Sequence, residues 1–165
     1  MSRSALDQLL FMMDCAFEGD ASQPDRSWHA LLVNLASVDS ADWGWTPPGG
    51  RRTIRQLVRE VGVVKYVCDS HAFGDASIHW SVPDSIPALD PDASPDEVIG
   101  WLRKAHQQLR DDVAALENDA ALLETRPSYM GEDLPIQWQI NTMIQHDIYH
   151  AGEINHIRAL RQDND

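Results

Sequence analysis

Two histidines in the C-terminal part of the chain, His146 and His150, are spaced four residues apart and are well suited to chelate a metal ion. On a helix with about 3.6 residues per turn, their side chains lie about 40° apart on one face. Glu153 lies on the same face, one turn further along. Two imidazoles on one helical face can bind one divalent cation, so this segment predicts a metal site. The alternative is that both histidines are solvated or hydrogen-bonded residues of an amphipathic helix.

A zinc-protease motif has similar spacing, because His156 follows His146 by ten residues, as the third histidine of a metzincin does. A metzincin needs glycine at the seventh position to turn the chain. Glu153 occupies that position here, and Gly152 comes one residue too early. The apolar residues that follow keep helical spacing, and on a continuing helix His156 points about 80° away from His146. We therefore exclude a metzincin protease.

The composition indicates one soluble domain spanning residues 1–165. The chain has 165 residues, 43% of them hydrophobic, which suffices for one core. Its formal net charge of −13 argues against a nucleic acid or an anionic membrane as partner, since phosphate groups would be repelled. The N-terminal segment does not read as a signal peptide, and no apolar run is long enough to span a membrane, so we expect a cytoplasmic protein. Cys15 and Cys68 are too few for a disulfide framework and are expected to be buried thiols.

The spacing of apolar residues predicts helices throughout and no β-strand. Asp25 or Ser27 is the expected N-cap of the second helix, and Thr53 that of the third. The Pro- and Gly-rich segment 42–52 and the Pro-rich segment 78–95 are expected to be loops, the latter a cover or edge. Such a pattern predicts an all-α helical bundle with long loops, in which facing helices build the metal site. The five predicted helices span residues 6–19, 27–38, 53–74, 96–123 and 134–161.

Four segments, in this order and spacing, resemble the DinB-like (DinB/YfiT) superfamily over nearly the whole chain. They are residues 28–32 (WHALL), 43–62 (WGWTPPGGRRTIRQLVREVG), 69–74 (DSHAFG) and 146–154 (HDIYHAGEI). The resemblance implies a four-helix bundle, often a homodimer, with one divalent metal held by a histidine of the second bundle helix and by the two histidines of the last. Relatives include thiol transferases that use bacillithiol or mycothiol and a mycothiol-dependent maleylpyruvate isomerase, and many members have no assigned activity.

The family's paired histidines correspond to His146 and His150, but its remaining ligand is replaced. In the family pattern Leu-Val-x-His-Val-Gly, this chain has Glu60 in place of the histidine. One carboxylate and two imidazoles suit zinc or nickel first, with iron as a further option. The alternative is a degenerate, metal-free homologue. His71 lies on the same helical face as Glu60, but eleven residues rise roughly 16 Å, so we expect a capping or outer-sphere residue there.

Glu153 is the candidate general base, because it can reach a metal-bound water or His150, although a plain surface pairing is equally compatible with its spacing. Asp147 either accepts a hydrogen bond from a ligand's free N–H or faces a partner helix. His29, His79 and His106 have no assigned role. The tryptophans are expected to be core and loop anchors rather than a cofactor site: Trp28, Trp43, Trp45, Trp80, Trp101 and Trp138.

Three functional classes remain open. The first is a metal-dependent enzyme that activates a low-molecular-weight thiol for attack on a small electrophile, which the resemblance favours. The second is a metal-dependent hydrolase that uses the same open coordination position for water. The third is a catalytically silent, metal-free bundle that acts as a dimeric scaffold, for which Glu60 is the main argument.

Overall fold

A computed structural model describes residues 2–162, and four long helices dominate it. These are α1 (Ser4–Phe17), α3 (Ile54–Ala72), α4 (Pro95–Ala114) and α5 (Ile136–Gln162). The prediction of a four-helix bundle is confirmed. The smaller elements are helix α2 (Leu31–Ala36), strands β1 (Thr125–Pro127) and β2 (Asp133–Pro135), and 3-10 turns at Pro24–Arg26, Ser40–Asp42, Pro83–Ser85 and Asp119–Leu123.

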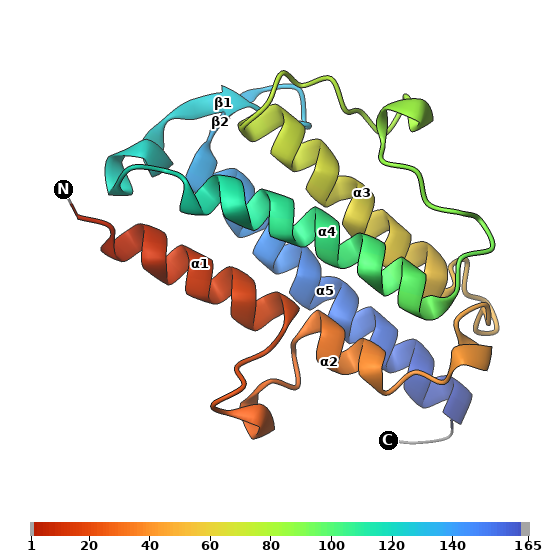
Figure 1. Ribbon diagram of the computed structural model, residues 1–165. Helices are drawn as coiled ribbons and strands as arrows, with labels where there is room; N and C mark the ends of the chain where they lie inside the picture. The colour runs from red at the N-terminus through yellow and green to blue at the C-terminus, as the bar shows by residue number, and fades with distance from the viewer. Residues whose placement is uncertain (1, 163–165) are drawn as a thin grey trace.

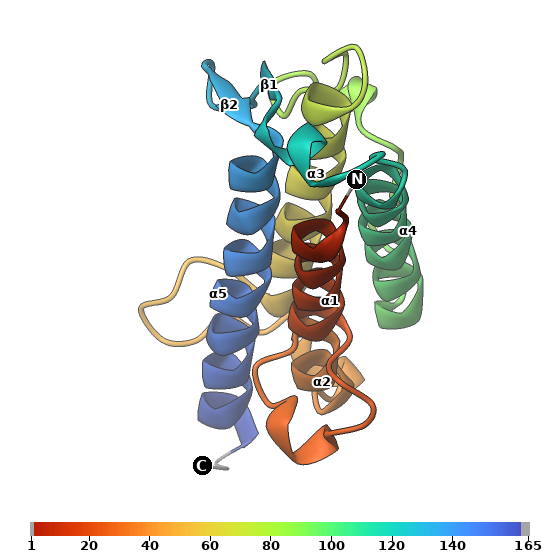
Figure 2. The ribbon, with the colours of Figure 1, turned by 90° about the vertical axis from the view of Figure 1, so that its left-hand side faces the viewer.

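The four long helices are arranged around the bundle in the order α1, α5, α3, α4, so α5 contacts both α1 and α3. Figure 1 shows α4 and α1 in front of α5, and the turned view in Figure 2 separates α5 from α4 on opposite sides. Helix α2 packs against the C-terminal half of α5. The segment between α2 and α3 runs beside α5 as well, where Asp42 accepts a hydrogen bond from Arg161 at 3.0 Å.

Apolar stripes of the helices form a continuous interior. In the first half of α3 the buried side chains recur every three or four residues, as the helical period requires, whereas residues 64–70 are buried on all sides of the helix. Each fully buried Leu, Ile or Val contributes about 1.5–3 kcal/mol relative to an exposed one. The fully buried large apolar side chains include Leu6, Phe17, Leu31, Ile54, Leu57, Leu102, Leu109, Ile136 and Ile140.

Two of the bundle helices begin with reciprocal capping boxes. The Thr53 side chain accepts from the backbone N–H of Gln56, whose side chain accepts from the backbone N–H of Thr53. Ser94 and Glu97 form the same arrangement at α4. Both caps satisfy backbone donors that the first helical turn leaves free, and they fix where α3 and α4 start. The predicted cap at Thr53 is confirmed.

Three sequence-based predictions are wrong in detail. The expected strand-free chain contains the antiparallel hairpin of β1 and β2, whose three-residue strands are too short to give an alternating pattern. The expected helix 96–123 ends at Ala114, and a 3-10 turn follows. Helix α2 is shorter than expected and has Ala30 rather than Asp25 or Ser27 at its N-cap, because Ser27 instead accepts from the backbone N–H of Asp20 at 2.8 Å.

The tryptophans differ in burial. Trp43 and Trp101 are buried, as predicted, and Trp45 is half-buried and packs against the same core. Trp28, Trp80 and Trp138 are exposed, so the anchor prediction is wrong for these three. The Trp101 ring lies against Gly62 of α3, where an added Cβ would be only 2.0 Å from a ring carbon. Only glycine allows α3 and α4 to approach so closely at this level. Of the two thiols, Cys68 is buried as predicted, but Cys15 is only half-buried.

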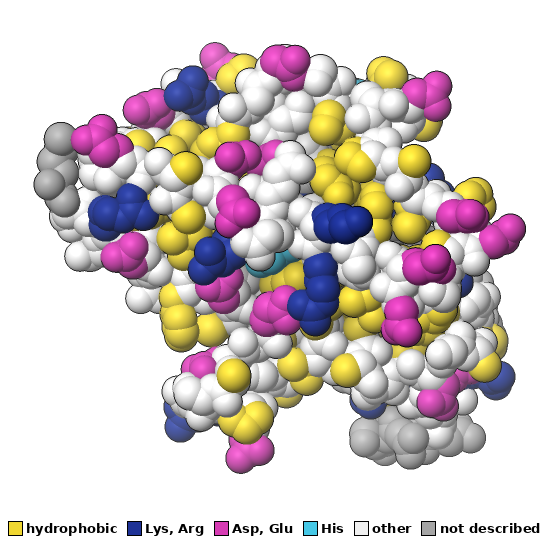
Figure 3. All heavy atoms as spheres, viewed as in Figure 1, with side chains coloured by type: hydrophobic (Ala, Val, Ile, Leu, Met, Phe, Trp, Pro, Cys, Tyr) yellow, Lys and Arg dark blue, Asp and Glu magenta, His cyan; other side chains and the backbone are white. Residues whose placement is uncertain are grey.

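None of the helices within residues 2–162 is long and apolar enough to cross a membrane. On the face in Figure 3, acidic and basic side chains lie side by side around patches of apolar surface, and the acidic residues do not gather in one area. The single domain, the homodimer and the cytoplasmic location stay predictions.

Candidate metal centre

Helices α3 and α5 bring Glu60, His146 and His150 together, with one ligand atom from each lying within 4.8 Å of the others. The two Nε2 atoms of the histidines are 3.1 Å apart. Two nitrogens bound to one tetrahedral zinc at about 2.05 Å would be separated by about 3.3 Å. The side chains therefore already have nearly the spacing that a shared cation requires.

Glu60 contributes one oxygen to this group. Its Oε1 lies 3.8 Å from His150 Nε2, on the side of the histidine pair. A modest rotation of the Glu60 side chain, which is 42% exposed, would bring Oε1 to a ligand spacing. One carboxylate oxygen and two imidazole nitrogens form a donor set that suits zinc or another borderline divalent ion and leaves a fourth position open. These three residues thus fit the predicted divalent cation.

His150 is held in one orientation by Glu153. The ring Nδ1 of His150 donates to Glu153 Oε2 at 3.0 Å, and the histidine is nearly fully buried. With its proton on Nδ1, a neutral His150 presents the lone pair of Nε2 to His146 and Glu60. Such outer carboxylates commonly fix the ring orientation of a histidine ligand.

His146 is neutral at ordinary pH, as a metal ligand must be. Burial, helped by the neighbouring His150, lowers its pKa to about 4. The two rings are nearly perpendicular, with centroids 4.4 Å apart. Above pH 5, a cation therefore competes with few protons for His146.

Arg52 completes the centre and was not anticipated from the sequence. Its Nη1 donates to Glu60 Oε2 at 2.5 Å, and its Nη2 donates to Glu153 Oε1 at 3.0 Å. The guanidinium thus joins the candidate ligand Glu60 to the residue that orients His150. The only hint in the sequence is its place directly before the Thr53 cap, which aims it at the first turns of α3.

Asp147 faces the neighbouring helix, which is the second of its two predicted orientations. It lies against α3 and accepts a hydrogen bond from Lys65 Nζ at 2.7 Å. Both side chains are almost completely buried, at 2% and 1% exposure. This ion pair joins α3 to α5 close to the metal centre without contributing a ligand to it.

The other histidines lie outside the group. His71 sits in the last turn of α3, with its ring centroid 6.2 Å from that of His79, and neither of its ring nitrogens bonds to a described residue. His71 does not belong to the group formed by Glu60, His146 and His150, as predicted, and it makes no capping bond. His156 is exposed, in line with the predicted divergence from His146. His106 is buried and stacks on Phe17 at 3.8 Å.

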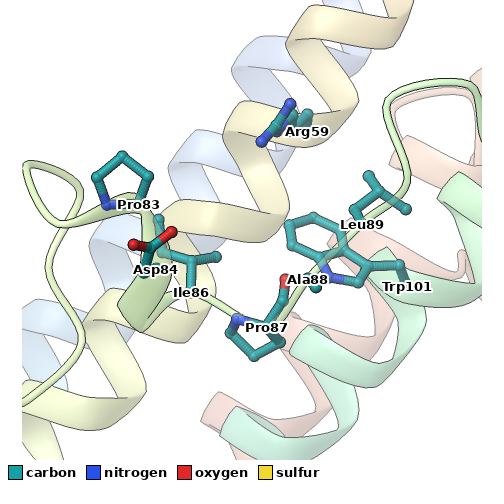
Figure 4. Close-up of a pocket in the computed structure, with 8 residues that line it drawn as sticks. All are labelled: Arg59, Pro83, Asp84, Ile86, Pro87, Ala88, Leu89 and Trp101. Carbon is teal, nitrogen blue, oxygen red and sulfur yellow. Dashed lines mark hydrogen bonds between the residues drawn. The ribbon is translucent and has the colours of Figure 1, made fainter.

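A separate cavity of about 340 Å³ lies between α3, α4 and the long segment before α4. Figure 4 shows its apolar lining, formed by Trp101 with Ile86 and Leu89, and two charged side chains, Arg59 and Asp84. Arg59 precedes Glu60 in sequence but points about 100° away from it around the helix. None of the three candidate ligands lines this cavity.

A family model described as "DinB superfamily" matches residues 23–154, which include every residue of the candidate centre. A search of curated proteins found no match.

Proposed function

The chain belongs to the DinB superfamily, and on that basis we propose that it is a metal-dependent enzyme whose divalent cation is held by Glu60, His146 and His150. The observation that carries the proposal is the convergence of two imidazole Nε2 atoms and one carboxylate oxygen within 4.8 Å. The two Nε2 atoms face each other at 3.1 Å, which is close to the spacing of two imidazole ligands on one cation. Zinc and nickel suit this donor set best, and iron is also compatible.

We propose transfer of a low-molecular-weight thiol to a small electrophile as the reaction. A cation at this place would supply a Lewis acid that lowers the pKa of a thiol in the open position. The protein's own residues hold that position in shape: His150 is fixed by Glu153, and Glu60 is fixed by Arg52. Glu60 and Arg52 are 42% and 37% exposed, so a small molecule can reach the centre from solvent.

Glu153 has a more specific role in this arrangement than the general base predicted from sequence. Its carboxylate accepts from His150 and from Arg52 at once. These bonds already occupy most of the lone pairs of the carboxylate, so little acceptor capacity is left for a substrate proton. We therefore propose that Glu153 mainly orients His150, and that proton transfer by Glu153 is secondary.

A metal-dependent hydrolase is the second candidate, because the same open position accepts water. Addition of a thiol to the cobalt-loaded protein distinguishes the two, since sulfur ligation produces an intense near-ultraviolet charge-transfer band. The band is expected for a thiol transferase, and a spectrum unchanged by millimolar thiol would favour the hydrolase.

Metal binding itself is tested by calorimetric titration of zinc and nickel into chelator-treated protein. We expect one ion per chain and a loss of affinity of roughly 100-fold or more in His146→Ala and in His150→Ala, because two ligands seldom retain a labile ion. Glu60→His should tighten binding, since imidazole matches these metals better. His71→Ala is the matched control and should bind like the wild type. A wild type that binds nothing would favour the metal-free scaffold instead.

A further inference from the structure

We propose that Arg52 sets the coordination number and the metal preference of this centre, by occupying carboxylate oxygens that would otherwise bind the cation. The inference rests on the proposed metal-dependent function and assigns a specificity-determining residue to it. Arg52 itself is not a ligand, because a guanidinium has donors and no lone pair to offer.

The contacts of Arg52 divide the oxygens of Glu60 between two tasks. Oε2 accepts from Arg52 Nη1 at 2.5 Å, while Oε1 lies on the side of the histidines, 3.8 Å from His150 Nε2. A charge-assisted bond of this length holds Oε2 firmly. Glu60 can therefore offer the cation one oxygen and cannot chelate it with both.

Arg52 also holds Glu153 in place. Its Nη2 contacts both carboxylate oxygens of Glu153, at 3.0 and 3.2 Å. Glu153 follows His150 by three residues on the same helical face, so a released Glu153 carboxylate could turn toward the same cation. With Arg52 present, Glu153 has its oxygens engaged by the guanidinium and by the His150 ring.

The charge balance points the same way. Arg52 cancels one of the two negative charges of Glu60 and Glu153, so it weakens the attraction of the site for any dication. It also leaves a donor set of two nitrogens and one oxygen, which suits zinc and nickel. Release of the two carboxylates would add oxygens, which manganese prefers relative to zinc.

Arg52 is not needed to anchor the loop that carries it. The segment before α3 is tied down by the Asp42–Arg161 bond at 3.0 Å and by the backbone bond from Arg55 N–H to the Trp43 carbonyl, also at 3.0 Å. The cap at Thr53 fixes the start of the helix. Removal of the guanidinium should therefore alter the centre without displacing the backbone.

The test compares manganese and zinc binding to metal-free wild type, Arg52→Gln and Arg51→Gln. Arg51 is the exposed neighbour of Arg52, so Arg51→Gln removes the same formal charge from the same loop. We expect Arg52→Gln to bind manganese roughly tenfold more tightly than the wild type does, and to gain a smaller factor in zinc affinity. The effect is limited to this size because solvent screens the partly exposed charges. Arg51→Gln should stay within about twofold of the wild type, as screened surface charges do. Thermal melts monitored by circular dichroism check that all three proteins are folded.

A second variant identifies the oxygens responsible. In Arg52→Gln/Glu153→Gln the released carboxylate is gone, so most of the gain for manganese should be lost. In the cobalt-loaded proteins, Arg52→Gln should show weaker visible d–d bands than the wild type, because higher coordination lowers their intensity.

The outcomes separate this inference from the proposed function. If the wild type binds metal and Arg52→Gln binds each metal only as tightly as the wild type or more weakly, the inference is wrong and the function stands. If only Arg52→Gln binds metal, the inference is supported and the metal-dependent function of the natural chain is not. If neither protein binds metal, both are wrong.

Discussion

Two sets of charged side chains lie between α3 and α5, one buried and one partly exposed. Lys65 and Asp147 form a pair that is almost completely buried, in which Lys65 bonds to Asp147 Oδ2 while Oδ1 has no hydrogen-bond partner among the described residues. Arg52, Glu60 and Glu153 form a network that is between 26% and 42% exposed and is linked to His150. The buried pair offers solvent almost no polar surface, whereas beside the network an oxygen of Glu60 and one nitrogen of each histidine lie within 4.8 Å of one another.

The difference separates what holds the helices together from what can do chemistry. A buried ion pair costs desolvation energy, and loss of one partner strongly lowers the stability of the fold because the other charge stays buried. The pair therefore fixes how α3 and α5 pack together. Half-exposed charges are screened by solvent, so the loss of one partner costs little folding stability. We infer that the register of α3 on α5 depends on Lys65 and Asp147, and that the ligand properties depend on Arg52 and Glu153.

Lys65→Met should have the largest effect of the changes considered. It leaves the Asp147 carboxylate buried without its partner, and burial already raises the pKa of Asp147. We expect the free energy of unfolding at pH 7 to fall by about 3–5 kcal/mol, measured by urea denaturation. The double variant Lys65→Met/Asp147→Leu should recover most of this loss, because no charge then remains buried.

A surface ion pair provides the control for that experiment. Arg103 and Glu18 pair at the surface with about half of each side chain exposed, so Arg103→Gln should cost less than about 1 kcal/mol. Equal losses of unfolding free energy in Lys65→Met and Arg103→Gln would mean that buried and exposed charges contribute alike to stability.

His106 sharpens the comparison, since it is a buried titratable group that has no hydrogen-bond partner among the described residues. Burial lowers its pKa to about 2, helped by the positive charges of Lys65, Arg110 and Arg103. In the unfolded chain its pKa is about 6.5, so below that pH the unfolded state binds more protons and stability falls. Relative to pH 8, His106 should cost the protein about 2 kcal/mol at pH 5.

The measurement is the difference between wild type and His106→Leu in urea titrations with chelator at pH 8 and pH 5. A difference is needed because Asp69, whose pKa burial raises to about 7, acts in the opposite sense and gains stability as the pH falls. The wild type should lose about 2 kcal/mol more than His106→Leu over this interval. Parallel pH profiles would mean that His106 is protonated in the folded protein.

Glu153→Ala tests the exposed network and should change stability least. Loss of the acceptor for His150 Nδ1 frees the ring and its tautomer, so zinc affinity should fall by roughly tenfold, while the free energy of unfolding changes by less than about 1 kcal/mol. Glu153→Gln keeps an oxygen that can accept from His150 and should retain most of the affinity. A similar loss in both variants would show that the charge of Glu153, rather than its hydrogen bond, supports metal binding.

Much of the candidate centre could be predicted from the sequence because it depends on helical periodicity. The positions of His146, His150 and Glu153 on one face follow from 3.6 residues per turn, and the cap and apolar stripe predict the helix that carries Glu60. The choice of Glu60 as a ligand depends on the resemblance to the DinB-like superfamily. The bundle follows for the same reason. Whether these ligands hold a metal stays a prediction.

Other features depend on contacts that local patterns do not encode. Arg52 lies in a loop without periodicity, and its partner Glu153 is 101 residues away. The place of Lys65 on the apolar stripe of α3 indicates a buried charge that needs a partner. Nothing in the local pattern identifies Asp147 as that partner. The short hairpin before α5 depends on tertiary bonds, including those from the Gln139 amide to the carbonyls of Arg126 and Leu134.

The contact between Gly62 and Trp101 limits how this sequence can drift during evolution. Any side chain at position 62 would meet the indole ring and push α3 and α4 apart, since packed interiors do not yield smoothly. Glu60 is two residues away on the same rigid helix, so such a shift would also move the carboxylate relative to the two histidines. Selection on the centre would therefore act on residue 62, which contributes no atom to it, and changes there would be accepted only together with a smaller residue at position 101.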